Sequence, residues 1–290
     1  MSPVVSILIT TYNRPELIRR AVESVRAQSF TDFELIIIDD ASALTQNLPL
    51  DARIRYYRNQ ENKASIHGDR VHIRRFVNEI AKGKYFVYLC DDDYWLMDTL
   101  LARQVALFEY YPSASMIIGG QTSDFGDSQQ FHSGIYPCQH MTSEYFLRHF
   151  AKNPITCNIN TGATLFHRDK FIRSGAFQLD RGSKWQAGYE MLLPAGSMGD
   201  VVYMDEPCLM VEVRKENASF QRTQLEHYLD SVESCRIALP DRIDILRETI
   251  YNIGQAYLKN AEYIKTHGAL TMCSPENISQ PVTEQDIITI

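Results

Sequence analysis

The first half of the chain alternates short apolar runs with segments whose apolar residues recur every three or four positions. The runs at 6–10, 33–39 and 85–90 are mainly apolar and rich in β-branched or aromatic residues, which is typical of strands buried on both faces. The segments at 13–28 and 98–111 place their apolar residues on one helical face. This alternation predicts strands that are followed by covering helices.

The same pattern continues further along the chain. Additional strands are predicted at 53–58, 115–120, 162–167 and 201–204, and a helix is predicted at 70–82. The stretch 121–160 is rich in Gly, Ser, Asn and Gln and is expected to be irregular. Strands that alternate with helices form βαβ units, so the predicted fold class is α/β, with a Rossmann-like, mostly parallel central sheet flanked by helices.

The pattern changes after Asn217, where strand-like runs stop and 221–265 becomes helical in character. The last twenty or so residues lack periodicity. We therefore expect a main domain at 1–219 and a helical C-terminal extension at 220–290, which ends in a loose tail. The extension can cover the acceptor side of a substrate site, form a homo-oligomer interface or dock to a larger assembly. The sequence does not distinguish among these three roles.

Composition narrows the classes of function. The 290 residues are 44% hydrophobic and carry a formal net charge of −7, with no long basic run. A nucleic-acid partner is therefore not expected, although small anions need only a local basic pocket. The six cysteines contain no CxxC pair, which indicates free thiols in a reducing compartment.

The beginning of the chain bears on location. "MSPVVSILITTYNRPE" has a short apolar stretch with no basic residues before it, unlike a signal peptide or a transmembrane segment. We expect a cytoplasmic protein without a transmembrane segment, either free or peripheral to the inner face of the membrane.

Polar residues follow three of the predicted strands. Thr10 and Tyr12 follow the first, Asp40 the second, and Asp91, Asp92 and Asp93 the strand at 85–90. In an open α/β sheet, ligands bind beyond the carboxyl ends of parallel strands. Aspartates are also common in turns. However, acidic groups follow two buried strands here, at Asp39-Asp40 and at Asp91–Asp93, and this favours one cleft with a cation among its carboxylates.

Four segments in order resemble a known family. "SILITTYNR", "FELIIIDDAS", "GKYFVYLCDDDYW" and "GDVVYMDEP" are similar to motifs of the inverting, nucleotide-sugar-dependent glycosyltransferases of family 2, which have the GT-A fold. The resemblance covers about residues 4–219. It implies a GT-A fold for this part of the chain and does not extend to the helical region after 220.

The resemblance implies nucleotide-binding roles at matching positions. The family's first motif and its Asp pair hold the base and ribose, which here are Thr10, Tyr12 and Asp40. A tyrosine ring can pack on a base, and a carboxylate can accept the imide N–H of uracil. Arg74 falls where the family places a nucleotide-contacting arginine, with Arg75 as the alternative if the register slips by one.

The resemblance also implies a divalent cation, Mn²⁺ or Mg²⁺, that bridges the donor diphosphate. In the common form "LDSDDYW" the first Asp falls at Cys90, so this sequence departs from the pattern there. We expect Asp92 to be the metal ligand and Asp91 to contact the ribose or donor sugar, with Asp93 least certain. Cys90 is interpreted as a buried thiol that ends a strand.

An inverting transfer needs a base for the acceptor hydroxyl. The family motif "EDYDLWLR" corresponds here to "KWQAGYEMLLPA", which places Gly188 at the usual Asp and Glu190 at the second acidic position. Glu190 is the candidate catalytic base and Asp180 the fallback. Trp185 and Tyr189 are candidates for acceptor binding, with core packing as the alternative for both.

A further segment, "VEVRKENAS", resembles the family's "YRRHPGSAS" and places Arg214 at a His that reaches the metal or diphosphate. An arginine there can hold phosphate oxygens directly, and a surface role is the alternative.

The sequence therefore predicts a metal-dependent inverting glycosyltransferase with a nucleotide-sugar donor, expected to be UDP-linked, and a glycan or glycolipid acceptor. One alternative is a catalytically silent module of the same fold that binds nucleotide or glycan, which Cys90 and Gly188 favour. A second is a sugar nucleotidyltransferase, which needs a Gly-rich loop after the first strand, where "TTYNRPE" has no glycine.

Overall fold

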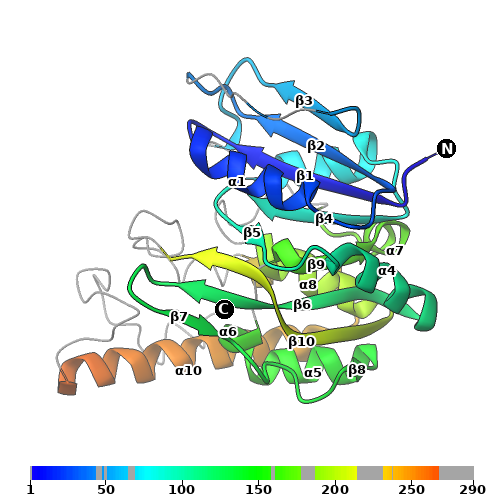
Figure 1. The fold of residues 1–290 in the computed structure, drawn as a ribbon. Helices are drawn as coiled ribbons and strands as arrows, with labels where there is room; N and C mark the ends of the chain where they lie inside the picture. Colours follow the sequence, from blue (N-terminus) through cyan, green and yellow to red (C-terminus); the bar gives the residue numbers. More distant parts are fainter. Residues whose placement is uncertain are drawn as a thin grey trace.

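A mixed sheet with helices on both faces forms the centre of the molecule (Figure 1). The computed structural model describes residues 2–43, 48, 51–64, 69–157, 161–177, 187–213, 231–236 and 238–267. The strand order is β3-β2-β1-β4-β9-β6-β10-β5, and β7 and β8 pair with β6 and β10. The strands are β1 (Val5–Thr11), β2 (Phe33–Asp39), β3 (Ile54–Arg58), β4 (Tyr85–Cys90), β5 (Tyr94–Trp95), β6 (Ala114–Asp124), β7 (Gln129–Phe131), β8 (His140–Met141), β9 (Thr164–His167) and β10 (Asp200–Glu212).

Strands β3, β2, β1 and β4 run parallel, as predicted. The register pairs Thr11 with Asp39 and Thr10 with Cys90, so β1, β2 and β4 end at the same edge of the sheet. Strands β6 and β10 are also parallel to each other. The predicted strand at 162–167 is β9, which runs antiparallel to both β4 and β6 and joins the two parallel groups.

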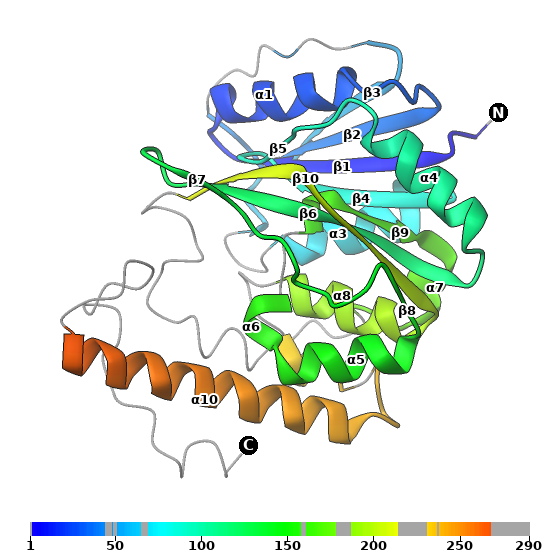
Figure 2. The ribbon, with the colours of Figure 1, turned by 60° about the horizontal axis from the view of Figure 1, so that its bottom comes forward.

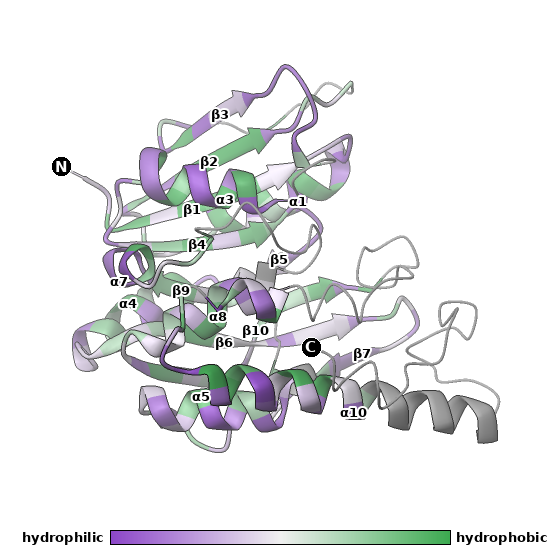
Figure 3. Ribbon diagram, turned by 180° about the vertical axis from the view of Figure 1, so that it is seen from behind, coloured by the Kyte–Doolittle hydropathy of each residue, from purple (hydrophilic) through white to green (hydrophobic). Residues whose placement is uncertain are grey.

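Each face of the sheet carries its own apolar core because side chains alternate along a strand. Ile7 and Ile9 pack with α1 (Pro15–Arg26) and α4 (Leu100–Tyr110), whereas Leu8 packs on the opposite face. The opposite face is covered by α3 (Arg70–Arg75), the π-helix η1 (Phe76–Ile80), α5 (Ser143–Lys152), α7 (Arg168–Arg173) and α8 (Ala187–Ser197). In Figure 3 the buried strand β2 is mainly hydrophobic, whereas the edge strand β3 is largely hydrophilic.

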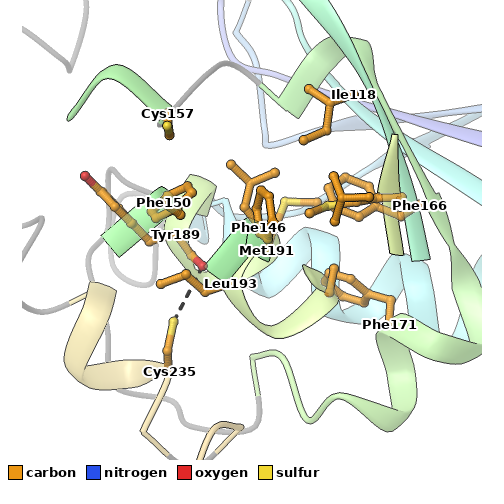
Figure 4. Packing of buried hydrophobic residues seen from close by; sticks show 14 of the residues in the cluster. Ile118, Phe146, Phe150, Cys157, Phe166, Phe171, Tyr189, Met191, Leu193 and Cys235 are labelled. Atoms are coloured by element: carbon orange, nitrogen blue, oxygen red, sulfur yellow. Dashed lines mark hydrogen bonds between the residues drawn. The ribbon is translucent and has the colours of Figure 1, made fainter. Parts of the chain in front are cut away.

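The C-terminal extension shares the second core. Helix α10 (Ile243–His267) lies beside α5 (Figure 2), and its Ile245, Ile250 and Ile253 belong to the same apolar cluster as α5 and α8. Before α10, the Cys235 thiol donates a hydrogen bond to the carbonyl of Tyr189 at 3.5 Å (Figure 4). These contacts attach the described part of the extension to the sheet domain.

The expectation that 121–160 is irregular was wrong for part of that stretch. Helix α5 begins after Thr142, whose side chain accepts a hydrogen bond from the amide of Tyr145, and α6 (Pro154–Cys157) follows. Phe146, Leu147 and Phe150 lie on the buried face of α5. This helical period was readable in the sequence, but the polar residues around it obscured it. A 3₁₀ turn, η2 (Thr161–Ala163), precedes β9.

None of the helices in the described part of the chain combines the length and the apolar character needed to cross a membrane.

Removal of a buried side chain from α10 tests whether the extension is integral to the fold. Ile253→Ala should lower the free energy of unfolding by about 2–4 kcal/mol, because Ile253 is fully buried in the shared core. Tyr251→Ala is the matched control, since Tyr251 is 55% exposed on the same helix, and it should change stability by less than about 0.5 kcal/mol. Urea denaturation measures both. An effect of Ile253→Ala as small as that of Tyr251→Ala would show that α10 does not contribute to the core.

Candidate active site

Polar side chains gather where β1, β2 and β4 end. The shared edge brings together Thr10, Thr11, Asp40 and Asp91, although these residues come from three separate segments of the chain. The Thr11 hydroxyl donates to Asp91 Oδ2 at 2.8 Å. The strand ends that carry the predicted acids are therefore neighbours at one edge of the sheet.

Asp91 is buried and ion-paired. Its Oδ1 lies 3.0 Å from Arg14 Nη1, and the same nitrogen lies 3.2 Å from Asp92 Oδ2. Burial raises the pKa of the Asp91 carboxyl to about 6, against the opposing effect of Arg14 and with a further contribution from Asp92. Arg14 therefore supplies positive charge beside the consecutive carboxylates of Asp91 and Asp92.

Asp92, Asp93 and Cys90 form a second group at the end of β4. Their ligand atoms all lie within 4.8 Å of one another. Two ligand atoms about 2.1–2.4 Å from a single ion are at most about 4.8 Å apart, so the Asp92 and Asp93 carboxylates can reach one divalent cation. Asp91 points instead to Thr11 and Arg14. Burial and the neighbouring aspartates raise the pKa of the Cys90 thiol well above its usual range.

Asp40 is buried and held by several donors. Its oxygens accept hydrogen bonds from Asn59 Nδ2 at 2.7 Å, from the Ala64 amide at 2.7 Å and from the Lys63 amide at 3.1 Å. His72 Nε2 lies 3.1 Å from Asp40 Oδ1. Burial opposes ionisation, but these donors outweigh it and hold the pKa of Asp40 below its usual value. The residue is a fixed anion beside the β1 end.

The predicted nucleotide-binding residues differ in exposure. Thr10 is buried, with its hydroxyl 3.1 Å from Tyr88 Oη and 3.3 Å from Asp69 Oδ1, whereas Tyr12 is 46% exposed. Arg74 is exposed on α3. Arg70, one turn earlier on the same helix, is buried.

The candidate base Glu190 lies in the first turn of α8 and is only 3% exposed. Arg70 Nη1 lies 3.3 Å from Glu190 Oε2 and 3.5 Å from Oε1. A cavity nearby is also lined by Phe177, Ser234 and Cys235. Glu190 therefore belongs to a buried ion pair with Arg70.

Tyr189 does not present its ring to an open surface. It is fully buried, and its ring packs edge-on against Phe150 (Figure 4). Its hydroxyl donates to the carbonyl of Pro154 at 3.0 Å. The acceptor-binding prediction for Tyr189 is corrected in favour of its alternative, core packing. Trp185, Asp180 and Arg214 lie outside the described residues.

Four residues of the site were not singled out from the sequence: Arg14, Asp69, Arg70 and His72. Arg14 lies within the quoted first motif, so its position beside the strand end was an available signal. The other three precede or begin α3, where sequence alone gives no indication of which strand end or helix each side chain reaches.

A separate cavity of about 750 Å³ lies between α4 and β10 and is lined in part by Arg103, Tyr110, Tyr203 and Glu206. None of the predicted site residues in the described part of the chain lines it. The candidate active site is therefore placed at the strand ends, where the charged groups converge.

Comparison with known proteins identifies relatives of this arrangement. Residues 6–175 match the family described as Glycosyl transferase family 2. Over 104 residues the chain is 34% identical to "GalNAc(5)-diNAcBac-PP-undecaprenol beta-1,3-glucosyltransferase" of Campylobacter jejuni, covering 34% of this chain and 32% of that protein. Matches of this kind span about a third of the length of the curated relatives.

Solved structures share the fold. The chain superposes on S. aureus TarS 1–349 in complex with UDP-GlcNAc with a TM-score of 0.63 and 12% identity, over 93% of this chain and 77% of that one. It superposes on the mannosyltransferase PcManGT of Pyrobaculum calidifontis, in complex with GDP-Man and Mn²⁺, with a TM-score of 0.58 and 17% identity, also over 93% and 77%. At such identities the likeness concerns the fold, which is GT-A.

The raised pKa of Asp91 predicts a pH-dependent stability difference. The folded state binds the Asp91 proton more tightly than the unfolded state, so this stabilising contribution is full below about pH 4 and is lost as the pH rises through about 6. Asp91→Asn lacks this contribution. The stability of the wild type relative to Asp91→Asn should therefore fall between about pH 4.5 and about pH 7.5, by at most about 3 kcal/mol.

Urea denaturation of both proteins, in buffer that contains a chelator and at both pH values, measures this difference in the free energy of unfolding. Asp127→Asn is the control, because Asp127 is an exposed loop residue. A stability difference between wild type and Asp91→Asn that does not change with pH would contradict the raised pKa.

Proposed function

Because this chain belongs to glycosyl transferase family 2, we propose that it is a metal-dependent inverting glycosyltransferase. It transfers a sugar from a nucleoside-diphosphate donor, UDP-linked, to a hydroxyl of a glycan or lipid-linked glycan. The observation that carries this proposal is the meeting of Asp92, Asp93 and the Cys90 thiol at the strand edge that also holds Thr10 and Asp40.

The donor nucleotide binds along the ends of β1 and β2 in this proposal. Tyr12 is exposed beside the edge and can pack its ring on the base, and Asp40 is a fixed anion that can accept the imide N–H of uracil. Thr10, Asp91, Arg74 and Arg214 complete the proposed nucleotide-binding set. The TarS structure with UDP-GlcNAc supports a UDP-linked donor only by similarity of fold.

Asp92 and Asp93 hold the divalent cation, Mn²⁺ or Mg²⁺, with Cys90 within reach of the same point. When bound, the cation stabilises the negative charge that develops on the departing diphosphate. Arg14 Nη1 pairs with both Asp91 and Asp92 beside this donor set. The Mn²⁺ in the PcManGT complex supports the choice of metal by analogy.

Glu190 is the proposed base, which accepts the proton of the acceptor hydroxyl as that oxygen attacks the sugar carbon. Its place in the first turn of α8 and its pairing with a buried arginine give the carboxylate a defined position. Trp185 remains the proposed acceptor-binding residue. The C. jejuni relative, named for an undecaprenol-linked acceptor, supports a glycan or lipid-linked glycan acceptor.

In this proposal 1–219 is the catalytic domain and 220–290 the extension, which supports α8 and can serve an oligomer interface. A lipid-linked acceptor would bring the protein to the inner face of the membrane.

The test of the proposal is turnover of nucleotide sugars. A panel of UDP- and GDP-linked sugars is incubated with the protein and Mn²⁺, Mg²⁺ or chelator, and release of the nucleoside diphosphate is measured. We expect release from at least one UDP-sugar, dependent on the metal. No turnover, together with no binding of any nucleoside diphosphate, would contradict the proposal.

Asp92→Ala should weaken Mn²⁺ binding by at least about tenfold, because it removes a carboxylate ligand from a small donor set. Electron paramagnetic resonance of free Mn²⁺ during titration measures this affinity without any catalytic step. Asp127→Ala is the matched control on an exposed loop and should bind like the wild type. Unchanged affinity in Asp92→Ala would remove Asp92 from its role.

Glu190→Gln should reduce transfer by about 10²–10⁴-fold while the affinity for UDP stays within about twofold, because the amide keeps the shape of the side chain but accepts no proton. Steady-state kinetics and calorimetry measure the two quantities. A large loss of UDP affinity would show that Glu190 supports the donor site instead.

The second candidate function is a catalytically silent module that binds nucleotide or glycan. Cys90 at the expected carboxylate position and the 3% exposure of Glu190 favour it. It predicts UDP binding without turnover of any donor in the same panel. A sugar nucleotidyltransferase is disfavoured by the absence of glycine in "TTYNRPE".

A further inference from the structure

The first turn of α3 connects three parts of the candidate active site. Asp69, just before the helix, accepts a hydrogen bond from the hydroxyl of Thr10 at the end of β1. His72 Nε2 lies 3.1 Å from Asp40 at the end of β2. Arg70, between them in sequence, reaches in another direction and contacts Glu190 on α8. A single helical turn therefore contacts both the donor-side strand ends and the candidate base.

This turn is firmly anchored. Ile73, Phe76 and Val77 on the same helical segment are buried in the core that also contains Phe86 of β4 and Phe171 of α7. A packed core resists displacement of its helices. The positions of Asp69, Arg70 and His72 relative to β1 and β2 are consequently set by the fold. Arg70 connects this helix to α8 through its contact with Glu190.

Arg70 and Glu190 are both deeply buried, at 7% and 3% exposure, with Arg70 Nη1 3.3 Å and 3.5 Å from the two carboxylate oxygens. A buried charge is costly unless it is paired, so each of these groups depends on compensation from its surroundings. A buried carboxylate without a cation nearby favours its neutral form, which cannot accept a proton. Arg70 places a positive charge within ion-pair distance of this carboxylate.

We propose that Arg70 is a positioning residue, which holds the Glu190 carboxylate at a fixed place relative to the donor-binding ends of β1 and β2. This inference rests on the proposed function, since it assigns Arg70 a role toward the proposed base. It separates Arg70 from Arg74, the arginine expected to contact the nucleotide, although the two lie one turn apart on α3.

The kinetic test compares Arg70→Met, Arg70→Lys and Arg148→Met with the wild type. Arg148 pairs with Glu144 on the surface of α5, so Arg148→Met is a matched control that removes an arginine from an ion pair outside the site. Arg70→Met should lower kcat about 10²-fold and leave the donor KM and the Kd for UDP within about threefold. Arg70→Lys keeps the charge and should recover about tenfold of the loss. Arg148→Met should match the wild type.

Two results would overturn the inference. A higher donor KM with an unchanged kcat in Arg70→Met would make Arg70 a donor-binding residue. A Lys variant as impaired as the Met variant, with both folded by circular dichroism, would show that the charge does not matter.

A second measurement keeps this inference distinct from the proposed function. If the wild type turns over no donor, the proposed function fails, and the contact is then tested by thermal unfolding of wild type, Arg70→Met, Glu190→Gln and the double variant. The double variant should lose less Tm than the sum of the two single losses, because the two side chains contact each other and each single variant already removes this shared contact. Additive losses would overturn the Arg70–Glu190 coupling. If Arg70→Met does not fold, the same cycle is run with Arg70→Lys.

Discussion

The candidate active site depends on compensation of carboxylates that the sheet brings together. Because β1, β2 and β4 are parallel and end in register, their polar residues must share one edge. Two of the buried acids there have identified compensating groups: Arg14 for Asp91, and backbone amides with His72 for Asp40. Without such partners, burial would favour the neutral forms of these carboxyl groups, because an unpaired buried charge is costly. These compensating groups are thus as much a part of the site as the aspartates.

Much of the fold could be predicted from the chain because buried parallel strands and their covering helices have strong periodic signals. The apolar runs predicted β1, β2 and β4 to within a residue or two, and the motif order indicated GT-A. Weaker elements escaped: α5 lies among polar loops, and β5 and β8 have two residues each, too short for a period. The antiparallel direction of β9 depends on chain reversal between elements, which a local pattern does not contain.

The site itself was less predictable, because its contacts join residues far apart in sequence. The strand-end acids were located by motif, but their partners were not, since Arg70 meets Glu190 across 120 positions. The distribution of roles among the aspartates also depends on local geometry. The Asp93 amide donates to the Cys90 carbonyl at 3.3 Å, so the chain turns back and places Asp93 with Cys90 and Asp92, while Asp91 faces Thr11. Three consecutive aspartates in a sequence do not show which of them faces Cys90 and which faces Thr11.

The central claim is that the strand edge binds a nucleoside diphosphate through a divalent cation. Calorimetric titration of UDP into the wild-type protein, once with Mn²⁺ and once with chelator, tests it most directly. The account predicts one site per chain, with a Kd at least about tenfold lower in Mn²⁺. Equal affinities in the two conditions would contradict the role of the metal, and no heat of binding for UDP or GDP in either condition would contradict the account as a whole.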